Sequence, residues 1–251
     1  ISLEWKPVKG LVLRTEATLS LNWKDQYRFW GALTGEGTKN NSLPVASIQK
    51  DQSFKYIWTN TASYGFSIKD KHNFSMLLGQ EIYHSQNKKN FQKNRYFPRA
   101  FEAGQAWDNM GFGTPQESTS SLSTPDRTAS FFGQASYNYN HKYLLSVTMR
   151  ADGSTKFAPG NQWGYFPSAA AAWRLSQESF LRDVEWLSDL KFRLSYGVTG
   201  STAISPYSTQ NTLRTENVVF DKNTTVAYVP SDTYTGDLKW ETTSQFNVGV
   251  D

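Results

Sequence analysis

The sequence lacks cysteine, has few histidines and contains no long apolar run, and each absence excludes a class of protein. Without cysteine, neither a disulfide framework nor a thiolate metal site can form. The three histidines, at positions 72, 84 and 141, are too scattered for a metal site, so we expect neither a metal ion nor a cofactor. No run of about 18 apolar residues occurs, and the mean hydropathy is −0.59, which excludes helical membrane spans.

A strong excess of charge of one sign is also absent, because 26 Lys and Arg stand against 22 Asp and Glu, for a net charge of +4. The basic residues are dispersed rather than gathered in a patch, so the sequence does not predict nucleic-acid binding. Acidic pairs such as Asp25 and Glu36 fall in connections between strands, where nothing fixes the carboxylate separation that a glycosidase needs. We therefore expect a protein that is not an enzyme.

What the chain has in abundance is alternation of apolar and polar residues, together with 15% aromatic residues. Successive side chains of a strand point to opposite faces, so alternation predicts strands with one apolar and one polar face. In 143–151, for example, every odd position is apolar or aromatic, while Ser146, Thr148 and Arg150 lie on the opposite face. Nine stretches follow this pattern, at residues 1–6, 11–23, 57–68, 73–84, 130–139, 142–151, 164–174, 190–199 and 238–251.

The two faces differ in a way that predicts their surroundings. The apolar sets are free of charge, as a surface in lipid requires, whereas the opposite faces mix charges with small hydroxyls, as the wall of a wet lumen would. This predicts an all-β fold, an antiparallel up-and-down transmembrane β-barrel. We expect Leu145, Val147, Met149, Phe192, Leu194 and Tyr196 to face lipid, and Gln134, Arg150, Lys191, Arg193 and Gln245 to face the lumen.

The connections between these strands alternate in length. Segments 7–10, 69–72 and 140–141 are short and rich in turn-forming residues, which predicts tight hairpins. Outer-membrane barrels have short turns on the periplasmic side and long loops outside, and the long connections 24–56, 85–129, 152–163 and 200–237 fit the second class. The exception is 175–189, which predicts a small amphipathic helix with Ser176 as N-cap and Phe180, Leu181, Val184 and Leu187 on one stripe.

Aromatic residues gather at the ends of the predicted strands. Trp and Tyr at both ends of the spans are typical of the two girdles that flank the apolar band of a barrel, although both residues are also common in strands generally. The residues concerned are Trp5, Trp23, Tyr139, Tyr143, Trp173 and Trp240.

The longest connection, 85–129, combines aromatic and charged residues within twelve positions. Aromatic rings stack on the apolar face of a sugar or on a peptide side chain, and charged groups orient polar ligands. We expect a ligand-binding cluster here; the alternative is that the same residues pack against another domain of the protein or against a partner protein. The cluster consists of Phe97, Arg99, Phe101, Trp107 and Asp108.

The second half of the chain carries a set of motifs in a fixed order. They are Arg150 to Ser154 (RADGS), Phe157, Asn161 to Ser168 (NQWGYFPS), Trp173 to Ser176 (WRLS), Leu190 to Gly200 (LKFRLSYGVTG) and Leu238 to Thr243 (LKWETT). As a set, they resemble the SusC-like (RagA-type) family of TonB-dependent transporters. The resemblance is strong over about residues 130–251, and over 1–129 it is limited to the architecture.

The resemblance implies a larger protein, in which a barrel of about 22 strands is closed by an N-terminal plug. It implies location in the bacterial outer membrane among its lipids, and import of an oligosaccharide or peptide energised by TonB–ExbB–ExbD. It also implies a SusD-like surface lipoprotein as partner. Both ends of the chain fall inside strand patterns, so we expect 1–251 to be about nine strands of a barrel whose plug, other strands and targeting segment lie outside this sequence.

A second class of protein gives the same alternation: a soluble carbohydrate-binding or adhesive β-protein whose aromatic residues stack on sugar rings. The two classes differ in the surroundings of the apolar face. A soluble sandwich buries that face beneath a second sheet, whereas a barrel leaves it exposed to lipid.

Overall fold

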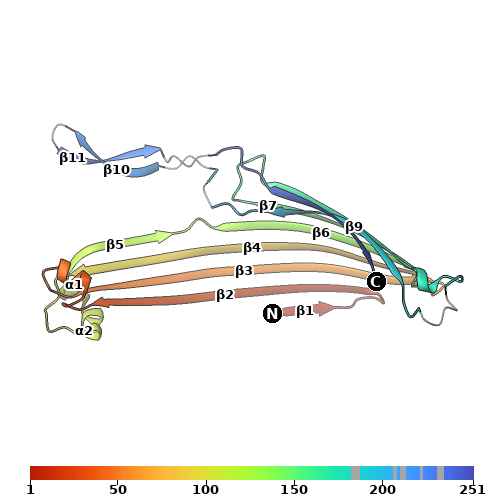
Figure 1. Cartoon of the computed structure of the whole chain (residues 1–251), viewed down its shortest axis with the longest axis horizontal. Coiled ribbons are helices and arrows are strands. Elements are labelled where there is room, and N and C mark those ends of the chain that lie inside the picture. Colours follow the sequence, from red (N-terminus) through yellow and green to blue (C-terminus); the bar gives the residue numbers. More distant parts are fainter. Residues whose placement is uncertain (182–186, 206–207, 210–212, 221–222, 231–234) are drawn as a thin grey trace. The chain divides into compact units, whose positions relative to one another are not determined.

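The computed structural model describes residues 1–181, 187–205, 208–209, 213–220, 223–230 and 235–251. Most regular structure in this part of the chain is antiparallel strand, which confirms the all-β prediction (Figure 1). The strands are β1 (Ser2–Trp5), β2 (Leu11–Trp30), β3 (Val45–Ile68), β4 (His72–Arg95), β5 (Thr114–Leu122), β6 (Asp126–Tyr139), β7 (Tyr143–Ser154), β8 (Trp163–Arg174), β9 (Lys191–Ser201), β10 (Leu213–Phe220), β11 (Asn223–Pro230) and β12 (Glu241–Val250). The short helices are α1 (Gly35–Lys39), α2 (Ala103–Asp108) and the 3₁₀ turns η1 (Met110–Phe112) and η2 (Leu175–Gln177).

The chain divides into two compact units, each described by itself below. Unit 1 consists of residues 1–18, 57–84 and 126–251, and unit 2 of residues 19–56 and 85–125. Hydrogen-bonded neighbours in the main sheet follow the order β1, β2, β3, β4, β6, β7, β8, β9, β12, and β5 adds to β4. The strands β10 and β11 pair with each other in a separate hairpin. The order along the main sheet follows the order along the chain, as an up-and-down barrel requires.

Two of the tight turns are built as the sequence predicts. Lys69 and Asp70 have φ angles of 52° and 53°, and Asn140 and His141 have φ angles of 48° and 58°. Two consecutive residues with positive φ are typical of the type I′ turn, whose twist matches that of the flanking strands. The amide of Lys142 closes the second turn by donating to the carbonyl of Tyr139 at 2.9 Å.

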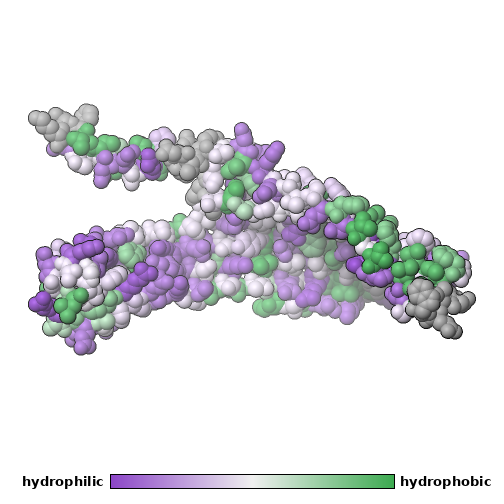
Figure 2. Space-filling view, in the orientation of Figure 1, coloured by the Kyte–Doolittle hydropathy of each residue, from purple (hydrophilic) through white to green (hydrophobic). Residues whose placement is uncertain are grey.

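The register of unit 1 places apolar side chains together on one face of the sheet. Leu145 lies opposite Ala171, Ala171 opposite Leu194, and Leu194 opposite Val248. Leu145, Leu194 and Val248 are nevertheless 52%, 39% and 57% exposed. Figure 2 shows apolar side chains gathered on the surface of unit 1, whereas hydrophilic side chains prevail over unit 2. The exposed apolar face fits a barrel wall and disagrees with the buried face of a soluble sandwich.

Aromatic side chains border this apolar face on β6, β7 and β8. Near the short turn, Tyr143 stacks against Tyr139 and Trp173, with ring centroids 6.2 Å apart in both pairs. Phe131 and Trp163 stack toward the opposite ends of these strands, also at 6.2 Å. Trp163 and Trp173 are ten residue steps apart on β8, a rise of roughly 33 Å. At a tilt of about 40° this gives a height of about 25 Å, that of an outer-membrane apolar band.

Trp240 does not belong to a girdle, and that part of the aromatic prediction is wrong. Its ring packs against Phe157 and Phe166, with centroids 5.4 and 5.2 Å apart. Phe166 lies opposite Arg150, on the polar side of the sheet. Position at a strand end marks a tryptophan as a girdle candidate, but only the register decides which face the ring takes.

Unit 2 shows that much of 24–56 and 85–129 is strand, where the sequence predicted loops. There β2 continues to Trp30 and β3 already begins at Val45. The strand β4 continues to Arg95, and β5 follows it in the sequence, before β6. Within 85–95 the single apolar residue is Phe91, so no apolar face marks this strand in the sequence. The hairpin of β10 and β11 likewise lies within 200–237, which the sequence predicted as a loop. A search for one apolar face misses strands that have two polar faces.

A small core forms the centre of unit 2. Phe97 and Ala106 are fully buried, and Met110 is 9% exposed. The helix α2 enters this core through a capping box, in which Glu102 and Gln105 satisfy each other's backbone amides. The core therefore ties the segment 97–112 to the strands of unit 2.

The turn that follows β8 begins with η2 instead of the start of an amphipathic helix. Ser176 lies inside η2, whose N-cap is Arg174, so the predicted N-cap is wrong. The Ser176 hydroxyl donates a hydrogen bond to Asp189 at 2.6 Å. This hydroxyl is the group that would otherwise cap a helix. Phe180 is 66% exposed, and Val184 lies outside the described residues.

Glu178 attaches this turn to the aromatic girdle. Its carboxylate accepts hydrogen bonds from the Tyr143 hydroxyl at 2.7 Å, the Trp173 indole at 3.1 Å and the Lys142 ammonium at 3.1 Å. These donors, the Tyr143 hydroxyl first, lower the pKa of Glu178 from 4.5 to about 2. The ionised carboxylate is therefore the form that holds the turn.

We expect the anchoring of this turn to weaken in acid. Because the folded pKa lies below the ordinary value of 4.5, the stabilisation is complete above that pH and is lost as the pH falls through about 2. The Glu178→Gln variant should therefore lose stability at neutral pH and depend less on pH below about 4.5 than the parent. Thermal unfolding in detergent measures this, with Glu117→Gln in β5 as the control for removing one carboxylate. A parent-like pH profile in Glu178→Gln would contradict the assignment.

Candidate functional site

The polar face of unit 1 carries a hollow of about 540 Å³. Its floor is a row of small side chains brought together by the register. Ser136 lies opposite Ser146, which lies opposite Ala170, which in turn lies opposite Ser195, and Asn247 completes the row. Small residues at these positions leave the space that larger side chains would fill.

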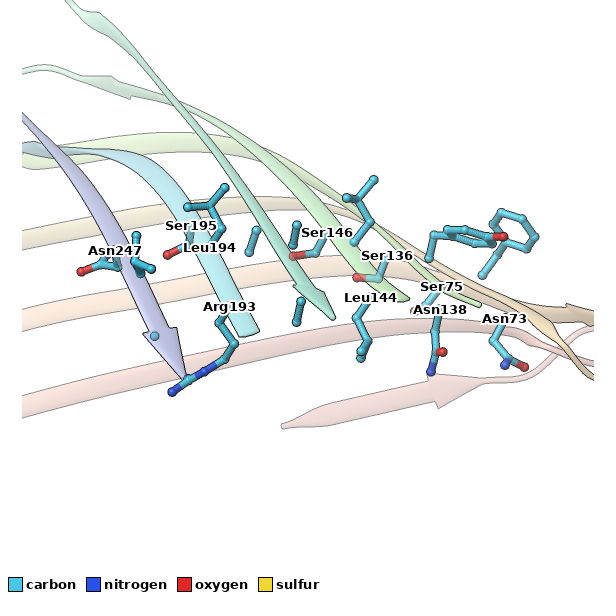
Figure 3. A pocket seen from close by; sticks show the side chains of 18 residues that line it. Asn73, Ser75, Ser136, Asn138, Leu144, Ser146, Arg193, Leu194, Ser195 and Asn247 are labelled. Atoms are coloured by element: carbon cyan, nitrogen blue, oxygen red, sulfur yellow. The ribbon is translucent and has the colours of Figure 1, made fainter. Parts of the chain in front are cut away.

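Longer polar side chains border this hollow. Figure 3 shows Asn73, Asn138 and Arg193 extending from the same side of the sheet, on β4, β6 and β9. The guanidinium of Arg193 donates to Asp251 at 2.5 Å, and Lys191 lies 3.6 Å from the same carboxylate. The hollow thus offers amide, hydroxyl and guanidinium groups to whatever lies against it.

Arg150 is held in a network of its own. Its Nε donates to both carboxylate oxygens of Asp152 at 2.8 Å, and its Nη2 donates to Ser130 at 3.0 Å. A second carboxylate, Glu81, lies 3.7 Å away, and the guanidinium lies over the Phe132 ring at 5.4 Å. These contacts give Arg150 a structural role, because they link neighbouring strands of the sheet.

The register places the remaining predicted lumen residues on the same face as Arg150 and Arg193. Gln134 lies opposite Thr148, and a row through β8 and β9 leads from Thr148 to Gln245. Both glutamines are exposed. The sequence predicted small hydroxyl residues such as Ser146 on this face, but it did not indicate that they line a hollow.

The structure divides the cluster predicted in 85–129 into buried and exposed members. Phe97 has no exposed surface and belongs to the core of unit 2. Phe101 and Trp107 are half-buried against that core, and the Phe97 and Phe101 rings lie 6.3 Å apart. Arg99 and Asp108 are exposed. The surface open to a ligand is therefore made by the charged residues and by the outer edges of two rings.

Trp107 is positioned by a neighbour that the sequence did not indicate. Its indole donates to the carbonyl of Arg28 at 3.2 Å, and its ring lies 5.4 Å from that of Tyr27. Tyr27 is 46% exposed, so the pair presents an aromatic surface. The two residues are 80 positions apart in sequence, and they meet because α2 packs in the core of unit 2 beside β2.

Ion pairs join helix α1 to strand β4 in the same unit. Lys93 contacts Glu36 at 2.7 Å, and Arg95 lies 3.9 Å from the same oxygen. The Lys93 ammonium, which donates to this carboxylate, lowers the pKa of Glu36. Lys93 also lies over the Trp30 ring at 5.2 Å. The carboxylate of Glu36 is thus engaged in attaching α1 to β4.

The described residues offer no grouping of three or more metal-ligating side chains. Across these residues, no helix combines the length and the apolar character that a membrane span needs.

Comparison with known proteins agrees with this architecture. The family model for the TonB dependent receptor-like beta-barrel matches residues 5–251. TonB-dependent receptor P3 of Formosa agariphila is 33% identical over 214 residues, which cover 83% of this chain and 21% of that protein. TonB-dependent receptor SusC of Bacteroides thetaiotaomicron is 34% identical over 190 residues, which cover 71% of this chain and 17% of that protein.

A solved structure, that of the RagAB peptide transporter, has the same fold. It superposes with a TM-score of 0.83 at 24% identity, over 98% of this chain and 27% of that one. The chain thus spans between 17% and 27% of the length of these proteins. The family model covers almost the whole chain and confirms the resemblance found in its motifs. The chain therefore belongs to the TonB-dependent receptor β-barrel family of the bacterial outer membrane, with SusC among its relatives.

Proposed function

We propose that the protein containing this chain imports an oligosaccharide or a peptide across the outer membrane, energised by TonB–ExbB–ExbD. The observation that carries the proposal is the two-faced sheet, with an exposed apolar face bordered by aromatic rings and a polar face that bears a hollow. Such a sheet separates lipid from a wet lumen. A soluble sugar-binding protein would instead bury the apolar face.

In this proposal, residues 1–251 are one part of a barrel, and the plug and the remaining strands come from elsewhere in the same protein. The support is the length of the relatives, because the chain covers only 17% of SusC and 27% of the RagAB chain. A sheet with free edges is not tolerated in lipid, so further strands must pair with β1 and β12. Energy coupling through TonB lies outside these residues.

The polar face is the lumen wall in this proposal. Gln134, Arg150, Lys191, Arg193 and Gln245 then point into the lumen, and the hollow beside Arg193 accepts polar groups. Arg150 is engaged by Asp152, so its contribution is to the rigidity of the wall. The residues around the hollow hold the more accessible hydrogen-bonding groups.

Unit 2 provides the recognition surface on the outer side. Arg99 and Asp108 are exposed, and Trp107 with Tyr27 supplies an aromatic surface. Rings of this kind stack on sugars or on peptide side chains, while the charged groups orient polar atoms. A SusD-like lipoprotein is the partner that we propose on this side, by analogy with SusC and with the RagAB peptide transporter. Phe97 belongs to the core against which Phe101 and Trp107 pack, so it supports this surface.

Uptake by whole cells tests the proposal. Cells that express the full-length protein are given two fluorescent probes, a pool of glucan oligosaccharides and a pool of tryptic peptides. We expect one pool to enter, and we expect entry to stop when the gene is deleted or when a protonophore removes the energy that TonB uses. Entry of neither pool, or entry that persists with the protonophore, would contradict energised import.

The surface of unit 2 is tested by the double variant Arg99→Ala/Trp107→Ala. We expect weaker uptake of the pool that enters, because an orienting charge and a stacking ring are both removed. The abundance of the folded barrel in the outer membrane should stay unchanged, and Lys89→Ala on the exposed part of β4 is the matched surface control. Unchanged uptake at normal abundance would place recognition in the plug and the lipoprotein.

A further inference from the structure

Three aromatic rings that come from separate motifs of the sequence pack together in unit 1. Phe157 and Phe166 are only 2% and 7% exposed, and the Trp240 ring contacts both. The Trp240 indole also donates to the carbonyl of Gln162 at 2.9 Å. Phe157 and Gln162 lie in the connection between β7 and β8, and Trp240 directly precedes β12. The group therefore joins the β7–β8 connection to the end of the segment 202–240.

Two glycines make room for these rings. A Cβ atom at Gly164 or at Gly200 would overlap the Phe166 ring, and at Gly164 it would also approach the Trp240 ring. Gly200 lies in β9, directly before the segment 202–240 begins. Small residues on two neighbouring strands thus allow the rings to lie flat against the backbone.

Lys156 attaches the other end of the segment to the same connection. Its ammonium donates to the carbonyl of Thr202 at 3.4 Å and lies 3.3 Å from the carboxylate of Asp126. Its own carbonyl accepts a hydrogen bond from the hydroxyl of Thr209 at 3.0 Å. Residues of 155–162 therefore contact both the beginning and the end of 202–240.

We infer that Lys156, Phe157, Phe166 and Trp240 are positioning residues, which fix both ends of the segment 202–240 to the β7–β8 connection. Closing a long segment costs more entropy than closing a short one, and contacts at its base remove part of that cost. The described ends of this segment, 202–205 and 235–240, and the connection 155–162 then form one recognition element on the outer side, a role that rests on the proposed function. This also gives a physical role to motif residues that neither the apolar face nor the hollow explains.

The variant Trp240→Ala in the full-length protein tests this inference. On intact cells, we expect trypsin to cleave at Arg214 roughly tenfold faster than in the parent, because the loss of two ring contacts and a hydrogen bond frees the base of the segment. Trp240→Phe keeps a ring and loses the donor, so its rate should be intermediate. Heat-modifiable migration on gels reports that each variant forms a folded barrel.

The matched control is Trp163→Ala, which is the first residue of β8 after this connection, lies on the apolar face and is 46% exposed. It should leave the cleavage rate as in the parent. Parent-like cleavage in a folded Trp240→Ala protein, or equally fast cleavage in Trp163→Ala, would overturn the inference. Cleavage requires no substrate, so this result is independent of whether import occurs. Faster cleavage with unchanged uptake would remove the segment from recognition while leaving import itself intact.

Discussion

Lysine in place of Leu194 is expected to destabilise the barrel by about 1–2 kcal/mol, because the cost of a lysine facing lipid falls from about 2–4 kcal/mol at the bilayer midplane to about 0–1 kcal/mol at the interface. Leu194 lies on the apolar face, opposite Ala171 and Val248, and is 39% exposed. Its partner Ala171 is two positions from the girdle residue Trp173 on β8, so Leu194 lies inside the apolar band but closer to this girdle than to the midplane. An ammonium at this depth must extend along the strand toward the interface to reach water, and it displaces an apolar side chain from the lipid-facing row, so a cost remains.

The adjacent position provides the control. Ser195 lies on the polar face, opposite Ala170 and Asn247, so Ser195→Lys adds the same charge toward the hollow. Urea titration of the full-length protein folded into lipid vesicles measures both variants, and the folded fraction in the outer membrane provides a second readout. We expect a larger loss for Leu194→Lys than for Ser195→Lys. Equal losses, or a larger loss for Ser195→Lys, would reverse the assignment of the two faces.

The strands of unit 1 could be predicted because one of their faces must be uniformly apolar. That requirement leaves a period of two in the sequence, and it fixed the strands that contain Leu145 and Leu194 to within a few residues. The extension of β4 to Arg95 has no such signal in the sequence, because both of its faces are polar. A strand of this kind is held by backbone hydrogen bonds to its neighbours and needs no apolar face. Pairing is decided by the partner strand, which local sequence does not reveal.

The composition of segment 85–129 indicated a candidate site, but it did not indicate which of its residues are buried. Phe97, Phe101 and Trp107 were equivalent in the sequence as aromatic residues near charges. In the structure, Phe97 is in the core, whereas Trp107, in helix α2, lies against Tyr27 of β2. Burial depends on contacts between distant segments, so no local pattern separates a ring that supports a surface from one that forms it.

Alanine in place of Phe97 is expected to destabilise unit 2 by about 3–5 kcal/mol, the usual cost of removing a buried phenylalanine ring. The ring is fully buried and contacts Phe101 on one side, and the backbone at Gly113 approaches it so closely that a Cβ there would overlap it. Such close packing leaves little room for the surroundings to collapse into the cavity. The cost should therefore fall in the upper part of this range.

Hydrogen exchange of the full-length protein in detergent can localise this effect. In Phe97→Ala, the amides of α2 and of the adjoining part of β4 should exchange faster, while those of β7 and β8 keep the protection of the parent, since they belong to unit 1. Phe112→Ala is the control, because that ring is 66% exposed and its loss leaves a far smaller cavity. Unchanged protection of α2 in Phe97→Ala would mean that the core does not hold the segment 97–112. Faster exchange together with reduced uptake would instead show that Arg99 and Trp107 depend on this buried ring for their position, and so that the core of unit 2 supports the recognition surface.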